Sequence, residues 1–104
     1  MGMILTGRHV SAREGLDLGF VNEVVPVGEA LQAAERWAAQ IGQNSPMSIR
    51  ASKQAVMDGL NVSLPEAIAA QREYPAVREM MESADYVEGP RAFAEKRPPR
   101  WRGK

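Results

Sequence analysis

Three serine-based helix-start signals divide this chain and constrain its fold more than any other feature. Ser11 and Ser63 are each followed three residues later by a glutamate, so that the two side chains of each pair can bind the free backbone amides at a helix start. Ser45 precedes Pro46, and proline suits the first helical position because the amide that it lacks would have no partner there. A chain of 104 residues with these signals is expected to be mostly α-helical.

The apolar residues between the signals recur at helical spacing. Between Gly28 and Gly42 they form one face of an amphipathic helix, made of Leu31, Ala34, Trp37, Ala38 and Ile41. The spacing predicts helices over 12–18, 28–42, 46–58 and Ser63 through Met81, with two short pieces at 84–87 and 90–95 and the last turns of another before Gly7. The sum is five or six helices and at most one short strand.

Prolines predict where these elements end. Pro75 lies inside the long helix, where proline costs about 3 kcal/mol, so a kink or break is expected near Tyr74. Gly89 separates the last two helical pieces, and the tail from Pro98 onward is expected to be extended. The β-prone residues 21–25 are the only candidate strand, and the sequence offers this strand no partner.

Composition argues against several functional classes. Lysine and arginine together number 13, as do aspartate and glutamate, so no protein-wide field attracts nucleic acid or an anionic membrane. No apolar run approaches the roughly 20 residues of a membrane span, and the N-terminus lacks a secretory pattern. The absence of cysteine fits a reducing, cytoplasmic compartment. With His9 as the single histidine, neither a zinc site nor a nucleophile–base pair is apparent.

Two carboxylates and one aromatic–cation pair remain as candidates for chemistry. Glu79 and Glu82 share a helix face, and we interpret them as solvated surface because nothing nearby in sequence would desolvate them. Phe93 lies three residues before Lys96, at the start of a tail with five cations in nine residues. An aromatic ring beside an ammonium suits a purine with a nearby phosphate. The alternative, favoured by the pattern alone, is that Phe93 is buried and the tail is merely solvated.

Three stretches resemble the enoyl-CoA hydratase/isomerase, or crotonase, family. They read "MILTGRHVSAREGLDLGFVNEVVP", "NSPMSIRASKQAV" and "EGPRAFAEKRPPRWRG", and the resemblance covers essentially the whole chain. It implies that residues 1–104 are the C-terminal helical region of such an enzyme, a lid and trimerisation element truncated at its N-terminus and lacking the ββα spiral. In the family the catalytic groups lie on that spiral, so no catalytic residue, metal or redox cofactor is expected in this chain.

The resemblance also assigns roles to three residues. The phenylalanine and lysine of the family's "AF.EK" stretch contact coenzyme A (CoA), which carries over to Phe93 and Lys96 and reverses the preference for a buried Phe93. Met81 falls where relatives place an apolar residue near the acyl pocket. Pro75 and Pro90 depart from the commonest pattern, in which helices run on.

The function expected from this resemblance belongs to a larger enzyme. The parent would hydrate, dehydrate or isomerise a C=C bond of an acyl-CoA thioester in the cytoplasm, as a trimer or a dimer of trimers. This chain alone is expected to be inactive. An alternative is an autonomous helical module that associates with itself through the Leu31/Trp37/Ile41 and Tyr74/Val77/Met81 faces. A nucleic-acid-binding tail is a third interpretation, and zero net charge counts against it.

Overall fold

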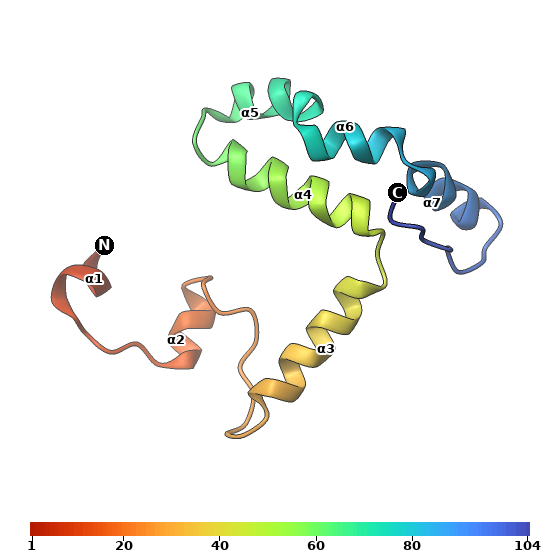
Figure 1. Ribbon diagram of the computed structural model, residues 1–104. Helices are drawn as coiled ribbons and strands as arrows, with labels where there is room; N and C mark the ends of the chain where they lie inside the picture. The colour runs from red at the N-terminus through yellow and green to blue at the C-terminus, as the bar shows by residue number, and fades with distance from the viewer. The chain divides into compact units, whose positions relative to one another are not determined.

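The computed structural model describes residues 1–104, and all its regular structure is helical (Figure 1). Its elements are α1 (Gly2–Thr6), α2 (Ala12–Asp17), α3 (Ala30–Gly42), α4 (Pro46–Gly59), α5 (Leu64–Ala70), a 3₁₀ turn η1 (Gln71–Glu73), α6 (Pro75–Glu82) and α7 (Ala84–Ala94). The mostly α-helical class is confirmed. The chain forms two compact units, Met1–Trp37 and Ala38–Lys104, which are described separately.

The candidate strand at residues 21–25 is absent. These residues form an irregular segment after α2, since a strand needs a neighbour to accept its backbone hydrogen bonds and the chain supplies none. The segment instead returns to α2, where the amides of Phe20 and Val21 donate to the carbonyl of Gly15 at 3.1 and 3.2 Å. A Cβ on Gly15 would lie 2.8 Å from the Val21 side chain and 2.9 Å from the Phe20 ring, so a larger residue here would force these side chains to move.

Helix α2 begins after Ser11 as the sequence predicts and ends at Asp17, one residue before the predicted end. Only half of the predicted capping box forms, because the Glu14 carboxylate pairs with Arg8 at 2.7 Å. The Ser11 hydroxyl accepts a hydrogen bond from the Glu14 amide at 3.1 Å, which satisfies one of the free donors of the first turn. Gly19 follows the helix with a φ of 84°, a left-handed conformation that glycine adopts without strain.

Helix α3 has the predicted amphipathic sequence, but its apolar stripe is not buried. Leu31 is 72% exposed and Trp37 and Ile41 are also exposed, whereas the residue that α3 does bury is Ala33. The indole of Trp37 donates to the Glu23 carboxylate at 2.8 Å. The periodicity therefore identified the helix correctly without identifying a partner for its apolar face.

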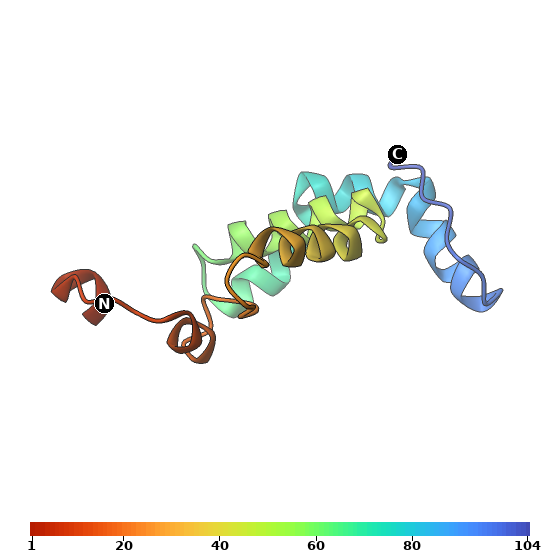
Figure 2. The ribbon, with the colours of Figure 1, turned by 90° about the horizontal axis from the view of Figure 1, so that it is seen from below.

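The second unit is built around α4. Ser45 caps this helix by accepting from the amides of Met47 and Ser48, and Pro46 occupies its first turn as predicted. Met47 and Ala51 on one face are buried. In Figures 1 and 2, α4 and α6 lie side by side and run in opposite directions, and the Gln54 side chain of α4 accepts from the first free amide of α6, at Ala76.

The predicted break near Tyr74 is confirmed. After α5 and η1, Tyr74 has an extended backbone with a ψ of 133°, as the residue before a proline prefers, and Pro75 then opens α6. The long helix predicted from Ser63 through Met81 is therefore two helices. The structure has seven α-helices in all, one more than the upper estimate.

The two short pieces predicted at 84–87 and 90–95 are one helix, α7, with Pro90 inside it. The proline removes a single hydrogen bond, to the carbonyl of Tyr86, and Tyr86 is half exposed, so water can replace the missing partner. Gly89 continues the helix and lies under the ring of Trp101, which would be in ordinary van der Waals contact, at 3.4 Å, with a Cβ at this position.

The tail after α7 is extended, as predicted, and runs back along the helix (Figure 2). The Trp101 indole donates to the carbonyl of Gln43 at 2.8 Å, and the Ala84 amide at the start of α7 donates to the carbonyl of Lys104 at 2.9 Å. The tail is thus attached both to Gln43, just after α3, and to the first turn of α7.

Candidate functional site

Phe93 and Lys96, the residues predicted to contact CoA, both lie at the C-terminal end of α7. Phe93 is in the last turn of the helix and is 87% exposed, so the alternative of a buried phenylalanine is wrong for this chain. Lys96 lies in the turn that ends the helix, is exposed, and makes no ion pair. The structure thus places an exposed aromatic ring next to a free ammonium-bearing residue.

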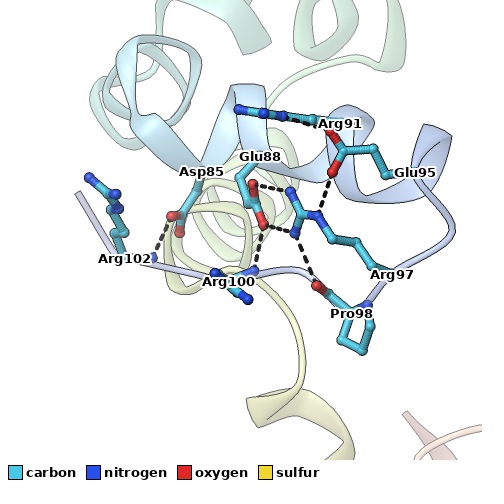
Figure 3. A network of polar contacts seen from close by, with 8 residues as sticks. All are labelled: Asp85, Glu88, Arg91, Glu95, Arg97, Pro98, Arg100 and Arg102. Carbon is cyan, nitrogen blue, oxygen red and sulfur yellow. Dashed lines mark hydrogen bonds and ion pairs between the residues drawn. The ribbon is translucent and has the colours of Figure 1, made fainter.

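The neighbouring charges belong to a closed network, defined here as the Glu88–Arg97 network of Glu88, Arg91, Glu95 and Arg97. Figure 3 shows the Arg97 guanidinium between the carboxylates of Glu88 and Glu95. It binds both oxygens of Glu88, at 2.6 and 3.0 Å, and one oxygen of Glu95, at 2.6 Å. Arg91 donates to the other oxygen of Glu95 at 2.9 Å. Two-point binding of this kind fixes orientation as well as distance.

These contacts change the acidity of the carboxylates. The hydrogen bond from Arg97, helped by one from the Arg100 amide at 2.7 Å, lowers the pKa of Glu88 to about 2. Hydrogen bonds from Arg91 and Arg97 also lower the pKa of Glu95. Both groups are therefore stably ionised at neutral pH, and neither is suited to act there as a general acid.

Asp85, in the first turn of α7, connects three segments. Its carboxylate accepts from the Ser45 hydroxyl at 2.7 Å, from the Arg102 amide at 2.7 Å and from the Gly103 amide at 3.1 Å. Burial alone would raise the pKa of Asp85, but these hydrogen bonds outweigh burial and leave the pKa below its ordinary value. The carboxylate thus joins the cap of α4, the start of α7 and the tail.

An open groove of about 500 Å³ lies between α7 and the tail. Most of its lining residues are charged: Glu88, Arg91, Glu95, Arg97, Arg100 and Arg102, with Ala84 and Val87. Of the four arginines, Arg91 and Arg97 are already paired, whereas the side chains of Arg100 and Arg102 make no ion pair. Phe93 and Lys96 do not line this groove, so they form a separate surface at the end of the helix.

Met81, the predicted acyl-pocket residue, lies elsewhere on the unit. It is 39% exposed and lines an open depression of about 310 Å³ together with Val77, Met80, Tyr86, Gln71 and Arg72. Of these side chains, Met80 and Met81 are flexible and apolar, whereas Gln71 and Arg72 are polar. The structure does not bring Met81 into the same site as Phe93 and Lys96.

The remaining candidates form no site. Glu79 and Glu82 are exposed on α6, in agreement with their interpretation as solvated surface, and His9 is exposed in the loop before α2. No group of three or more His, Cys, Asp or Glu side chains is placed to hold a metal ion. No helix is both long and apolar enough to cross a membrane.

Sequence reasoning missed Asp85, Glu88 and Trp101, the residues that hold the tail in place. The available signal was weak: Glu88 and Arg97 are oppositely charged, but their separation of nine residues does not match a helical contact. They meet only because the tail reverses direction after α7.

Comparison with known proteins defines the class. The family model described as enoyl-CoA hydratase/isomerase matches residues 1–104, and this chain belongs to that family. The predicted resemblance is therefore confirmed.

Among curated proteins, the carnitinyl-CoA dehydratase of Salmonella arizonae is 40% identical over 106 residues, covering 97% of this chain and 40% of the relative. The carnitinyl-CoA dehydratase of Proteus mirabilis is 36% identical over 107 residues, again with 40% of the relative covered. This chain thus spans about two fifths of the length of the curated relatives that it matches.

Solved structures give the same result. An enoyl-CoA hydratase/isomerase from Mycobacterium paratuberculosis aligns with a TM-score of 0.87 at 33% identity, covering 94% of this chain and 38% of that one. An enoyl-CoA hydratase from Bacillus anthracis aligns with a TM-score of 0.85 at 35% identity, covering 97% and 38% of the two chains. The helical arrangement is therefore that of part of a crotonase fold.

Proposed function

We propose that this chain is the C-terminal helical part of an enzyme that hydrates, dehydrates or isomerises a C=C bond of an acyl-CoA thioester. The observation that carries this proposal is the family match over residues 1–104 combined with coverage of only 40% of the carnitinyl-CoA dehydratase relative. In this proposal the chain supplies CoA and subunit contacts. The groups that make and break bonds lie on the rest of the enzyme.

The side chains of the chain support this division of labour. A catalytic acid–base pair needs titratable groups held close together in a protected site, and Glu79, Glu82 and His9 are all exposed. The two carboxylates with the most partners, Asp85 and Glu88, are fully used in attaching the tail. Binding is a role that the exposed end of α7 can fulfil without such a pair.

Phe93 and Lys96 are the proposed CoA contacts. A flat exposed ring can stack on the adenine base, and stacking of this kind contributes about 1–3 kcal/mol per base. The ammonium of Lys96, one helical turn further along the chain, can bind a phosphate group. Met81 is proposed to contact the acyl chain from the depression that it shares with Val77 and Tyr86.

Subunit contacts form the second part of the proposal. Leu31, Trp37 and Ile41 recur along one face of α3 and are all exposed, and apolar surface of this kind commonly covers a partner. We propose that such faces pack against the rest of the enzyme and its neighbouring subunits, in a trimer or a dimer of trimers located in the cytoplasm.

A chimeric enzyme tests the CoA contacts directly. The matching segment of the Salmonella arizonae carnitinyl-CoA dehydratase is replaced by this chain, and steady-state kinetics are measured with its CoA substrate. Phe93→Ala and Lys96→Ala are each expected to raise KM about tenfold, with kcat nearly unchanged, because each removes a binding contact and no reacting group. Arg100→Ala is the matched control, since it removes a free guanidinium from the same tail.

Two results would count against the proposal. Unchanged KM in both the Phe93 and Lys96 variants would remove their assigned role. Turnover of crotonyl-CoA by this chain alone, followed by the enoyl absorbance, would contradict the assignment of catalysis to the rest of the enzyme.

A second candidate function is an autonomous self-associating helical module. It is favoured by the same exposed α3 face, which would pair with a second copy instead of with the rest of an enzyme. Light scattering of the purified chain, with and without Leu31→Glu, distinguishes this case. A monomer at high concentration excludes it.

A further inference from the structure

Helix α7 ends in a turn whose hydrogen bonds define a Schellman motif. The Lys96 amide donates to the Phe93 carbonyl at 3.2 Å, and the Arg97 amide donates to the Ala92 carbonyl at 3.1 Å. This motif requires a left-handed backbone at the first of the two donor residues, and Lys96 has a φ of 52°. Glycine is the usual residue there, since a Cβ is strained in that conformation.

Lys96 is the single exception to a rule that the rest of the chain follows. The other positive φ angles all occur at glycines, namely Gly7, Gly19, Gly28 and Gly103. A lysine in such a position is destabilising, and strain of this kind persists where the side chain serves a purpose other than folding. The question is therefore what the Lys96 side chain does.

Local electrostatics do not explain the lysine. A cation near a helix C-terminus interacts favourably with the helix dipole, but the neighbouring positions with ordinary backbone would provide the same benefit. The nearest acidic groups of the turn, Glu88 and Glu95, are already bound to arginines, and Lys96 makes no ion pair. The ammonium therefore has no partner in this chain.

Arg97, the residue after Lys96, holds the turn that contains Lys96 in place. All three guanidinium nitrogens of Arg97 are hydrogen-bonded, to Glu88, to Glu95 and to the carbonyl of Pro98 at 3.1 Å. With no donor nitrogen left unbound, Arg97 is poorly placed to bind a ligand itself. Its contacts instead hold the backbone on the C-terminal side of Lys96 against α7.

We propose that Lys96 occupies this glycine position because its ammonium binds a phosphate group of CoA, and that Arg97 is the positioning residue that holds the turn. This inference rests on the proposed CoA contact of Phe93 and Lys96. It adds that the left-handed backbone at Lys96 is maintained for ligand binding at the expense of stability. Lys96 and Arg97 then act as one unit, because Arg97 contributes only through the lysine.

The stability part is tested by unfolding the full chain in urea and by heat, followed by circular dichroism. Lys96→Gly is expected to raise the melting midpoint by roughly 4–8 °C relative to Lys96→Ala, because only glycine relieves the left-handed strain. Gly28→Ala is the matched control and should lower the midpoint, because it introduces a Cβ at another left-handed position.

The ligand part is tested by titrating the chain with CoA and following amide signals of α7 by NMR. Lys96→Gly and Lys96→Ala are both expected to weaken binding roughly tenfold, although one is stabilised and the other is not. Titrations with 3′-dephospho-CoA and with inorganic phosphate identify which phosphate is bound.

The role of Arg97 is tested by Arg97→Lys, which keeps the charge but loses two-point binding. This change should weaken CoA binding severalfold in the natural chain and have no further effect in the Lys96→Ala background.

Each outcome supports or overturns the inference. A Lys96→Gly chain that is more stable and binds CoA as well as the natural chain refutes it, as does a Lys96→Gly chain no more stable than Lys96→Ala. Additive losses from Arg97→Lys and Lys96→Ala would show that Arg97 acts independently. Phe93→Ala reports on the proposed function separately: loss of binding there with full binding in both Lys96 variants leaves the CoA site standing and removes only this inference.

Discussion

In the unit Met1–Trp37 only Gly15 and Ala33 are buried. The unit Ala38–Lys104 buries several apolar residues and, in addition, the polar residues Ser45, Ser83 and Asp85. In the first unit the contacts are local turns and exposed ion pairs such as that between Arg8 and Glu14. In the second, buried hydrogen bonds join segments far apart in the chain, and no buried side-chain polar atom lacks a partner. A buried polar network specifies one arrangement, because every alternative leaves donors or acceptors unsatisfied.

The largest expected effect comes from Asp85. Asp85→Ala leaves the Ser45 hydroxyl and two tail amides without their acceptor and should lower the free energy of unfolding by about 2–3 kcal/mol. Urea unfolding monitored by circular dichroism measures this change. The exposed Glu79→Ala serves as the control, and equal stability of the two variants would contradict the contrast between the units.

Replacing each tryptophan in turn compares the units directly. Trp101→Phe removes the hydrogen bond to Gln43 and part of the ring that covers Gly89, and should cost about 1–2 kcal/mol of unfolding free energy. Trp37→Phe removes a hydrogen bond to the exposed Glu23 and should cost less. Thermal unfolding of both variants decides the order, and a larger loss for Trp37→Phe would reverse our interpretation.

Acid should release the tail of the second unit. The pKa of Glu88 is lowered to about 2, so its stabilising contribution is complete above its unfolded pKa of about 4.3 and is lost as the pH falls towards 2. In a Trp37→Phe background Trp101 is the only tryptophan, and its fluorescence should change in this pH window. Glu88→Gln should weaken that pH dependence. The same fluorescence transition in the natural and Glu88→Gln chains would show that Glu88 does not hold the tail.

The smallest effect is expected in the first unit. Glu23→Gln weakens the exposed pair with Arg36 and should change the free energy of unfolding by less than about 1 kcal/mol. Differential scanning calorimetry can distinguish this small change from the larger loss of stability expected for Asp85→Ala. A loss as large as that of Asp85→Ala would show that the first unit also depends on specific polar contacts.

Local rules predicted much of the fold. The helix starts at Ser11 and Ser45 and the break at Tyr74 depend on residues next to one another in sequence, and the structure contains all three. The same local reading failed around Gly89 and Pro90, where helix α7 continues. Trp101 lies over Gly89 from outside the helix, and no local pattern predicts this contact.

The contacts that hold the tail could not be predicted, because they join residues far apart in the chain. Ser45 and Asp85 are separated by 40 positions, and nothing local marks either as the partner of the other. The helix dipole already accounts for an acidic residue in a first helical turn, so Asp85 gave no sign of a distant partner. The exposure of Phe93 was equally hidden from apolar periodicity, which favours burial, and only the family resemblance predicted it.

Arg97, Arg100 and Gly103 each bond to a residue of α7, and Trp101 bonds to Gln43 just after α3. The positions of these contacts fix the length of the segment that connects them. Two consecutive prolines, at 98 and 99, stiffen this segment, so the backbone cannot bend to accommodate a change in its length. A one-residue insertion or deletion there would misalign every later contact together. Evolution should therefore preserve the length of this stretch more strictly than that of the exposed loop around Gly28, and gaps among related sequences should accumulate there instead.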